Sequence, residues 1–275
     1  MIEDLFLIEK HAYRDSPIHR LDARAKIVLT LSVIVALVAV PYTTIVYTVG
    51  LVFLAFFIVL WAFSGLSLKV YLGRLLVIVP LWGVIILFQI FLKNGYYTEY
   101  HPILILPLGI AVYAESVQFA SIVFVKFFLC ISFVILLSST SKVHDLLEGA
   151  GRLGLPAEFA LTLGMMIRYL FVFGWMYRKI SESLATRCFD PFDRSLPYRY
   201  RIRQIGYHVG SLFLRSYEQG ERTYTAMLCR GYGRNSHLFL RKKPLPRRDW
   251  AFLSCSMAFV VAVPVIICFG TIPGL

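Results

Sequence analysis

Two short segments of the sequence each place an arginine among small side chains, where a helix is expected to end. Residues 185–188 read Ala-Thr-Arg-Cys, and residues 226–231 read Ala-Met-Leu-Cys-Arg-Gly. Each arginine could hydrogen-bond the last carbonyl groups of its helix, where the helix dipole favours a cation. Alternatively, each segment is a docking tip whose guanidinium offers two parallel donors to a carboxylate. The candidate docking residues are Ala185, Arg187, Cys188, Ala226, Arg230 and Gly231.

Other sequence patterns that carry chemistry are missing. The chain has no Gly-x-x-x-x-Gly-Lys-[Ser/Thr] phosphate-binding loop, no His-Glu-x-x-His and no Gly-x-Ser-x-Gly. Its six histidines are scattered without the spacing of a metal pair, and its five cysteines form no Cys-x-x-Cys. We therefore expect no catalytic residue, no metal site and no bound cofactor on this chain.

The composition is that of a membrane protein. Hydrophobic residues make up 58% of the chain, charged residues only 16%, and the mean hydropathy is +0.70. Soluble domains are about 45–50% apolar and about 25% charged. So much apolar surface does not fit inside one water-surrounded core of this size, and the elements that carry the two arginine segments must be placed relative to a bilayer.

Long uncharged stretches predict the membrane spans. No charged residue occurs between Lys26 and Lys69, a stretch too long for one span, so the chain is expected to turn at Pro41. We expect spans near residues 26–40, 43–64, 75–92, 114–137 and 251–270. Lys126 falls inside the fourth span, where packing or snorkelling is favoured over a functional role.

The interval 155–248 has a different character. Residues 157–177 are apolar enough to span but contain Glu158 and Arg168, and both flanks are basic, which favours a shallow or re-entrant helix over a full span. Residues 209–227 show helical spacing of apolar side chains, and Gly231 is expected to stop this helix.

These segments predict an all-α polytopic membrane protein with about five transmembrane helices and further helices inserted before the last span. Residues 1–155 form an N-terminal membrane region, 156–248 a cytoplasmic helical region, and 249–275 the last span and tail. Residues 178–248 contain 16 Lys and Arg against five Asp and Glu. Such a basic stretch can indicate nucleic acid, but between apolar spans it marks a cytoplasmic loop. The N-terminus is then cytoplasmic and the C-terminus outside.

Four segments in this order resemble a known family. They are Ser-Pro-Ile-His-Arg-Leu-Asp-Ala-Arg-Ala-Lys at 16–26, Asp-Leu-Leu at 145–147 with Arg-Leu-Gly-Leu-Pro at 152–156, Arg-Tyr-Leu at 168–170, and residues 226–231. The sequence resembles the transmembrane T component of energy-coupling factor (ECF) transporters, specifically the CbiQ-type subunit of cobalt importers, from about residue 8 to 270. The family usually has Ala where Cys229 stands, and Ala and Gly where Thr186 and Cys188 stand.

The resemblance implies a non-catalytic coupling subunit in the cell membrane. Two cytosolic ABC-type ATPases would bind ATP and magnesium, and a separate membrane subunit would bind the substrate. The cytoplasmic helices would couple them, with Arg187 and Arg230 anchored in grooves on the ATPases. Cobalt is the expected substrate, with nickel or a vitamin as alternatives. Nucleic acid is not an expected partner.

Two functions of other classes compete with this interpretation. A secondary transporter or channel would need a polar site near the midplane, yet the first three predicted spans contain no Asp, Glu, His, Lys or Arg beyond Lys26 at the edge of the first. An intramembrane enzyme would need carboxylates or histidines clustered on the spans, and the sequence has no such cluster.

Overall fold

The computed structural model of the protein describes residues 16–91, 102–105, 111–188, 190, 196–233 and 245–270. Their elements fall into two compact units, which are described separately. The bundle unit comprises the described residues of 7–150 and 243–275, and the α7–α8 unit those of 151–242.

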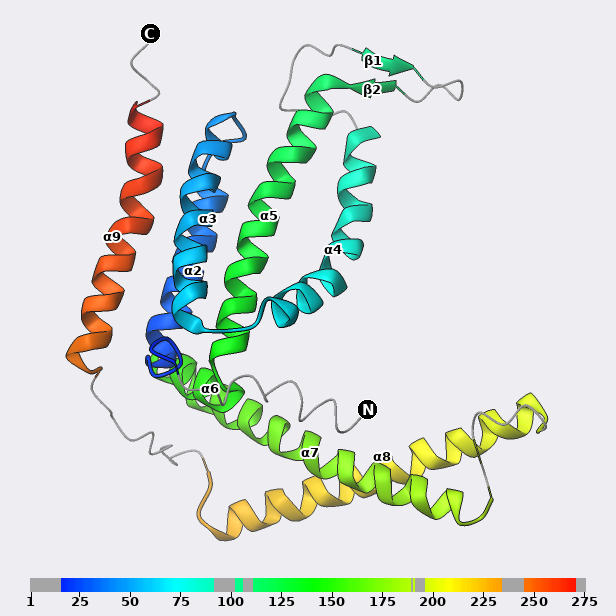
Figure 1. The fold of residues 1–275 in the computed structure, drawn as a ribbon. Helices are drawn as coiled ribbons and strands as arrows, with labels where there is room; N and C mark the ends of the chain where they lie inside the picture. The colour runs from blue at the N-terminus through cyan, green and yellow to red at the C-terminus, as the bar shows by residue number, and fades with distance from the viewer. Residues whose placement is uncertain are drawn as a thin grey trace. The chain divides into compact units, whose positions relative to one another are not determined.

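The bundle unit is built of long apolar helices and one short helix (Figure 1). The elements are α2 (Ala23–Ala39), α3 (Ile45–Ser64), α4 (Leu68–Phe91), α5 (Ala114–Thr140), α6 (Val143–Arg152) and α9 (Arg247–Gly270). Helices α2, α3 and α4 each pack against α5, while α9 packs against α2 and α3. The long helices coincide with the five segments that the sequence predicts as spans.

The interior of the bundle is filled by aromatic and branched side chains. Phe53 and Phe133 are fully buried, and the ring of Phe57 lies 5.6 Å from those of both Phe133 and Tyr71. Tyr71 makes a 2.7 Å hydrogen bond with the hydroxyl of Ser132. Such close packing and interhelical hydrogen bonding are what hold helices together in lipid.

The outer face of the bundle is also apolar. Leu51, Leu76 and Val77 are 70%, 73% and 75% exposed. Exposed side chains of this kind on long helices are suited to lipid, because hydrogen bonding within the helix satisfies the backbone. The chain is an all-α multi-pass membrane protein, as the sequence predicts.

By length and composition, four described helices could cross a membrane: α3, α5, residues 158–185 of α7 and residues 247–267 of α9. Helix α2 has 17 residues, near the lower limit for a span. The depth of α7, which the sequence predicts to lie shallow, stays a prediction, and so does the total of five spans.

A bend and a small sheet interrupt the regular bundle. Helix α4 contains Pro80 and is bent in Figure 1, as expected when a proline removes a helical hydrogen bond. Between α4 and α5 the strands β1 (Pro102–Ile105) and β2 (Ala111–Tyr113) pair antiparallel. The sequence predicts an all-α protein, so this hairpin is an addition to the expected fold.

Two buried lysines link α2 and α5, because each donates a hydrogen bond to the C-terminal end of the other helix. The Nζ of Lys126, on α5, donates to the Val40 carbonyl at the end of α2 (2.5 Å) and lies 4.2 Å from the centre of the Tyr42 ring. The Nζ of Lys26, on α2, donates to the carbonyl of Thr140, the last residue of α5 (2.9 Å). Each lysine therefore binds the carbonyl end of the other helix, where a cation is favoured. This supports the packing interpretation of Lys126.

The segment before α2 ties three helices together. Asp22 accepts a hydrogen bond from the backbone N of Arg24 (3.1 Å) and so caps α2, while its own backbone N donates to the buried Asp249 carboxylate of α9 (2.9 Å). On α6, a Cβ added at Gly149 would lie 3.3 Å from the Cβ of Ala23. Glycine therefore lets α6 approach the start of α2 closely.

The second unit consists of two long helices, α7 (Ala157–Ala185) and α8 (Tyr198–Cys229), which cross each other (Figure 1). The hydroxyls of Tyr169 and Thr223 form a hydrogen bond between them, and the rings of Tyr177 and His208 lie 5.1 Å apart. Burial at this contact lowers the pKa of His208. The side chains of α8 are all at least partly exposed, so its surface is available to a partner.

Candidate functional site

The two arginine segments adopt the same backbone turn. Helix α7 ends at Ala185, and Cys188, which follows Arg187, has a φ of 57°. Helix α8 ends at Cys229, and Gly231, which follows Arg230, has a φ of 82°. In both segments the residue after the arginine is left-handed, a common way to end a helix. Cys188 is the single non-glycine residue with positive φ in the described part of the chain.

The hydrogen bonds of the two turns also correspond. The backbone N of each arginine donates to a carbonyl three residues earlier, Leu184 for Arg187 and Met227 for Arg230, both at 3.0 Å. The following residue does the same at 2.9 Å in both turns. The similarity inferred from the sequence therefore extends to the three-dimensional structure of the two segments.

The candidate docking residues lie at the surface. Ala185, Arg187, Cys188, Ala226, Arg230 and Gly231 are all exposed. Among the residues that the structure describes, neither the Arg187 nor the Arg230 guanidinium has a hydrogen-bond or ion-pair partner. The backbone amides close these turns, so the arginine side chains are left available to another molecule.

The two tips lie at opposite ends of the helix pair. Helices α7 and α8 cross with their carboxyl ends pointing apart (Figure 1). Arg187 follows the end of α7 and Arg230 the end of α8. The pair of helices can thus present an arginine tip to each of two separate surfaces.

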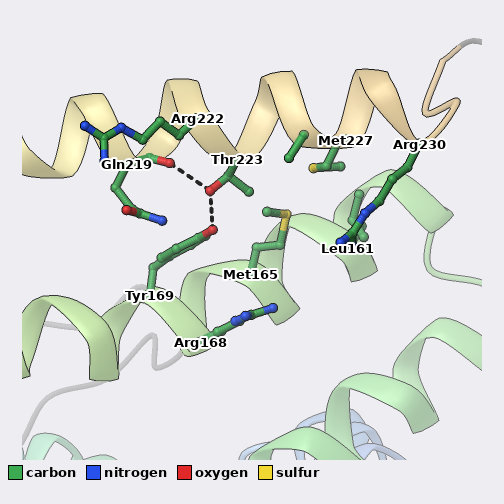
Figure 2. A pocket seen from close by; sticks show the side chains of 10 residues that line it. Leu161, Met165, Arg168, Tyr169, Gln219, Arg222, Thr223, Met227 and Arg230 are labelled. Carbon is green, nitrogen blue, oxygen red and sulfur yellow. Dashed lines mark hydrogen bonds between the residues drawn. The ribbon is translucent and has the colours of Figure 1, made fainter.

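A groove between α7 and α8 adjoins the second tip. It has a volume of about 460 Å³, and Figure 2 shows side chains from both helices around it. Its polar lining consists of Arg168 and Tyr169 from α7 with Gln219, Arg222, Thr223 and Arg230. Thr223 also donates to the Gln219 carbonyl (2.7 Å), so its hydroxyl is held in place.

The sequence alone did not reveal this groove. It marks Arg168 only as a charge in an apolar helix, and in the structure Arg222 forms a 3.8 Å i,i+4 ion pair with Glu218. The grouping of Arg168 with Arg230 depends on how α7 pairs with α8, and no spacing within one helix encodes that pairing.

The described residues contain no group of three or more His, Cys, Asp or Glu that could hold a metal ion.

An apolar helical bundle combined with an exposed basic helix pair defines a multi-pass membrane protein. Residues 14–239 match the model of the CbiQ family, described as cobalt transport protein, and the chain belongs to this family. It is therefore a membrane component of cobalt transport. It is also similar to Uncharacterized protein MJ1571 of Methanocaldococcus jannaschii, with 25% identity over 93% of this chain and 84% of that protein.

Proposed function

We propose that this chain is the transmembrane coupling subunit of an ATP-driven importer of the ECF type. The observation that carries the proposal is the matched pair of arginine tips, which share one turn geometry and lie at opposite ends of α7 and α8. Each tip enters a groove on one of two cytosolic ABC-type ATPases, where Arg187 or Arg230 binds a carboxylate. ATP and magnesium are bound by those partners, and this chain is not catalytic.

The third partner is a membrane subunit that binds the substrate. Helix α7 carries an exposed apolar stripe at helical spacing, formed by Phe159, Met166 and Leu170, which are 62%, 58% and 51% exposed. This stripe and the outer face of the bundle contact the substrate-binding subunit and lipid. Closure of the ATPases moves α7 and α8 and so tilts that subunit.

Cobalt is the proposed substrate because the family is one of cobalt transport proteins. Nickel or a vitamin are the alternatives, since in such an importer the partner and not this chain binds the substrate. The chain lies in the cell membrane with its N-terminus and the α7–α8 unit in the cytoplasm and its C-terminus outside, as the distribution of Lys and Arg favours.

Co-purification of the ATPases tests this proposal. The tagged chain is co-expressed with the products of its neighbouring genes, as wild type and as Arg187→Glu, Arg230→Glu and the double variant. Loss of a desolvated charge contact costs about 2–5 kcal/mol, so each single variant should retain less ATPase and the double variant none.

Arg215→Glu is the matched control, because Arg215 is an exposed arginine of α8 away from both tips. It should retain the ATPases like wild type. A folded wild-type chain that retains no ATPase would refute the proposal. Transport of cobalt by the chain alone in proteoliposomes without ATP would instead establish a secondary transporter or channel.

A further inference from the structure

The first ten residues of α8 combine positive charge with aromatic side chains. Residues 198–207 read Tyr-Arg-Tyr-Arg-Ile-Arg-Gln-Ile-Gly-Tyr, with three arginines and no Asp or Glu. At the other end of the helix, residues 218–230 contain two Arg and two Glu, so their formal charges cancel. The positive charge of α8 is therefore concentrated towards its beginning, and we call residues 198–207 the basic start of α8.

The large side chains of the basic start are exposed. Tyr198, Tyr207 and Ile202 are 69%, 59% and 49% exposed. Arg199 and Arg203 are exposed as well, and within the part of the chain that the structure describes neither forms an ion pair. The guanidinium of Arg203 lies instead over the Tyr207 ring, 5.7 Å from its centre. Large apolar groups left exposed together mark a surface that binds a partner.

Arginines and apolar side chains alternate along the basic start, so they surround the helix instead of occupying separate faces. Arg199 and Arg203 lie on one face, because four residues make about one turn, while Arg201 lies on the opposite face. Tyrosine and arginine side by side are typical of the membrane–water interface, where the ring lies at the level of the headgroups and the cation reaches the phosphates. Anionic phospholipids carry the charge that complements these arginines.

The direction of α8 favours lipid over an ATPase as the partner. Helices α7 and α8 cross near the contact of Tyr177 with His208, with the beginnings of both helices on one side of the crossing and both tips on the other (Figure 1). In the proposed function Arg187 and Arg230 point to cytosolic ATPases, so the basic start points the opposite way, to the membrane surface. The 32 residues of α8 make a helix about 48 Å long, which separates the basic start from the Arg230 tip.

We propose that the basic start of α8 binds the headgroups of anionic phospholipids in the cytoplasmic leaflet. Arg199 and Arg203 bind the phosphates, and the rings of Tyr198 and Tyr207 lie between the headgroups. The inference rests on the proposed function, which sets the direction of α8, and goes beyond it. Helix α8 is then held by lipid at its beginning and by an ATPase at its end, so the ATPase moves one end of the helix while the other stays at the membrane surface.

The test measures hydrogen exchange of the full chain in nanodiscs of phosphatidylcholine alone and of phosphatidylcholine with phosphatidylglycerol. Each arginine close to an anionic surface strengthens binding about fivefold. Phosphatidylglycerol should therefore slow exchange of the amides of residues 198–207 at least fivefold and leave residues 218–229 unchanged. Arg199→Gln/Arg203→Gln should remove most of this slowing, and Tyr198→Ser/Tyr207→Ser should weaken it without changing the charge of the chain.

Arg178→Gln/Arg215→Gln is the charge-matched control, since both residues are exposed and lie outside the basic start, and it should keep the full slowing. Equal exchange in the two lipids, or slowing that survives Arg199→Gln/Arg203→Gln, would overturn the inference.

Co-purification separates this inference from the proposed function. Arg199→Gln/Arg203→Gln should retain the ATPases like wild type, because both residues lie away from the tips. Loss of the ATPases from this variant, with wild-type exchange insensitive to phosphatidylglycerol, would assign the basic start to an ATPase and overturn the inference. A wild-type chain that retains no ATPase would refute the proposed function, whereas the exchange measurement, made without ATPases, decides on the lipid contact by itself.

Discussion

Gly231 and Cys188 occupy the same position of two matched turns but differ in conformational cost. A side chain with a Cβ in the left-handed region costs about 1–2 kcal/mol, whereas glycine adopts it freely. Cys188 therefore holds its turn under more backbone strain than Gly231, and its neighbours must stabilise it. The first tip is expected to open more readily than the second.

We predict that Gly231→Ala destabilises the end of α8 by about 1 kcal/mol. The added Cβ would meet no atom within 4 Å, so the effect is purely one of backbone conformation. Hydrogen exchange measures this loss of stability, because the amides in the last turn of α8 should exchange faster in the variant. Gly233→Ala is the control, because Gly233 has no positive φ. Equal exchange rates in the two variants would contradict the assigned turn.

The buried Lys126 gives a second prediction. In Lys126→Met the Val40 carbonyl loses its donor while the packing volume is nearly kept, so the bundle should lose about 1–3 kcal/mol of stability. Thermal unfolding of the detergent-solubilised protein measures this loss. Lys69→Met removes an exposed lysine and should leave the melting temperature unchanged. A similar shift for both variants would show that Lys126 does not bind the end of α2.

At the scale of elements, the close approach of α6 to α2 depends on Gly149. In Gly149→Ala the new Cβ would lie 3.3 Å from the backbone nitrogen of Arg24, so one helix must move. We predict a loss of about 1–3 kcal/mol in unfolding free energy, typical of overpacking. Gly73→Ala, where a Cβ meets nothing within 4 Å, should be neutral or stabilising. A neutral Gly149→Ala would mean that α6 is not tightly held.

Elements with strong local signals could be predicted from the sequence. Uncharged apolar stretches and Pro41 locate α2 and α3 within a few residues, because bilayer thickness limits helix length. The start of α8 at Tyr198 was missed, since residues 198–208 form an exposed helix without an apolar stripe. The β1–β2 hairpin was missed because its strands are only four and three residues long and show no alternation of apolar and polar side chains.

The candidate site, too, could be predicted from the sequence only in part. The two arginine tips are local, so residue types and glycine placement predict them. The groove is not local, because it combines Arg168 with residues more than fifty positions later in the chain. It forms only where α7 and α8 pair, beside the hydrogen bond between Tyr169 and Thr223.

For the whole molecule, we predict a transmission element that does not itself bind the transported ion. The described residues offer no cluster of metal ligands. Calorimetric titration of the purified, untagged chain with cobalt(II) should therefore detect no stoichiometric binding, whereas the complex with its substrate-binding subunit should bind. Tight one-to-one binding by the chain alone would contradict the assigned role.

The proposed function requires that the two arginine tips hold two ATPases. Native mass spectrometry of the co-expressed, purified complex tests it most directly by counting ATPase subunits per chain. We predict two for wild type and for Arg215→Glu, and none for Arg187→Glu/Arg230→Glu. Two ATPases on the double variant, or none on a folded wild-type chain, would contradict the claim.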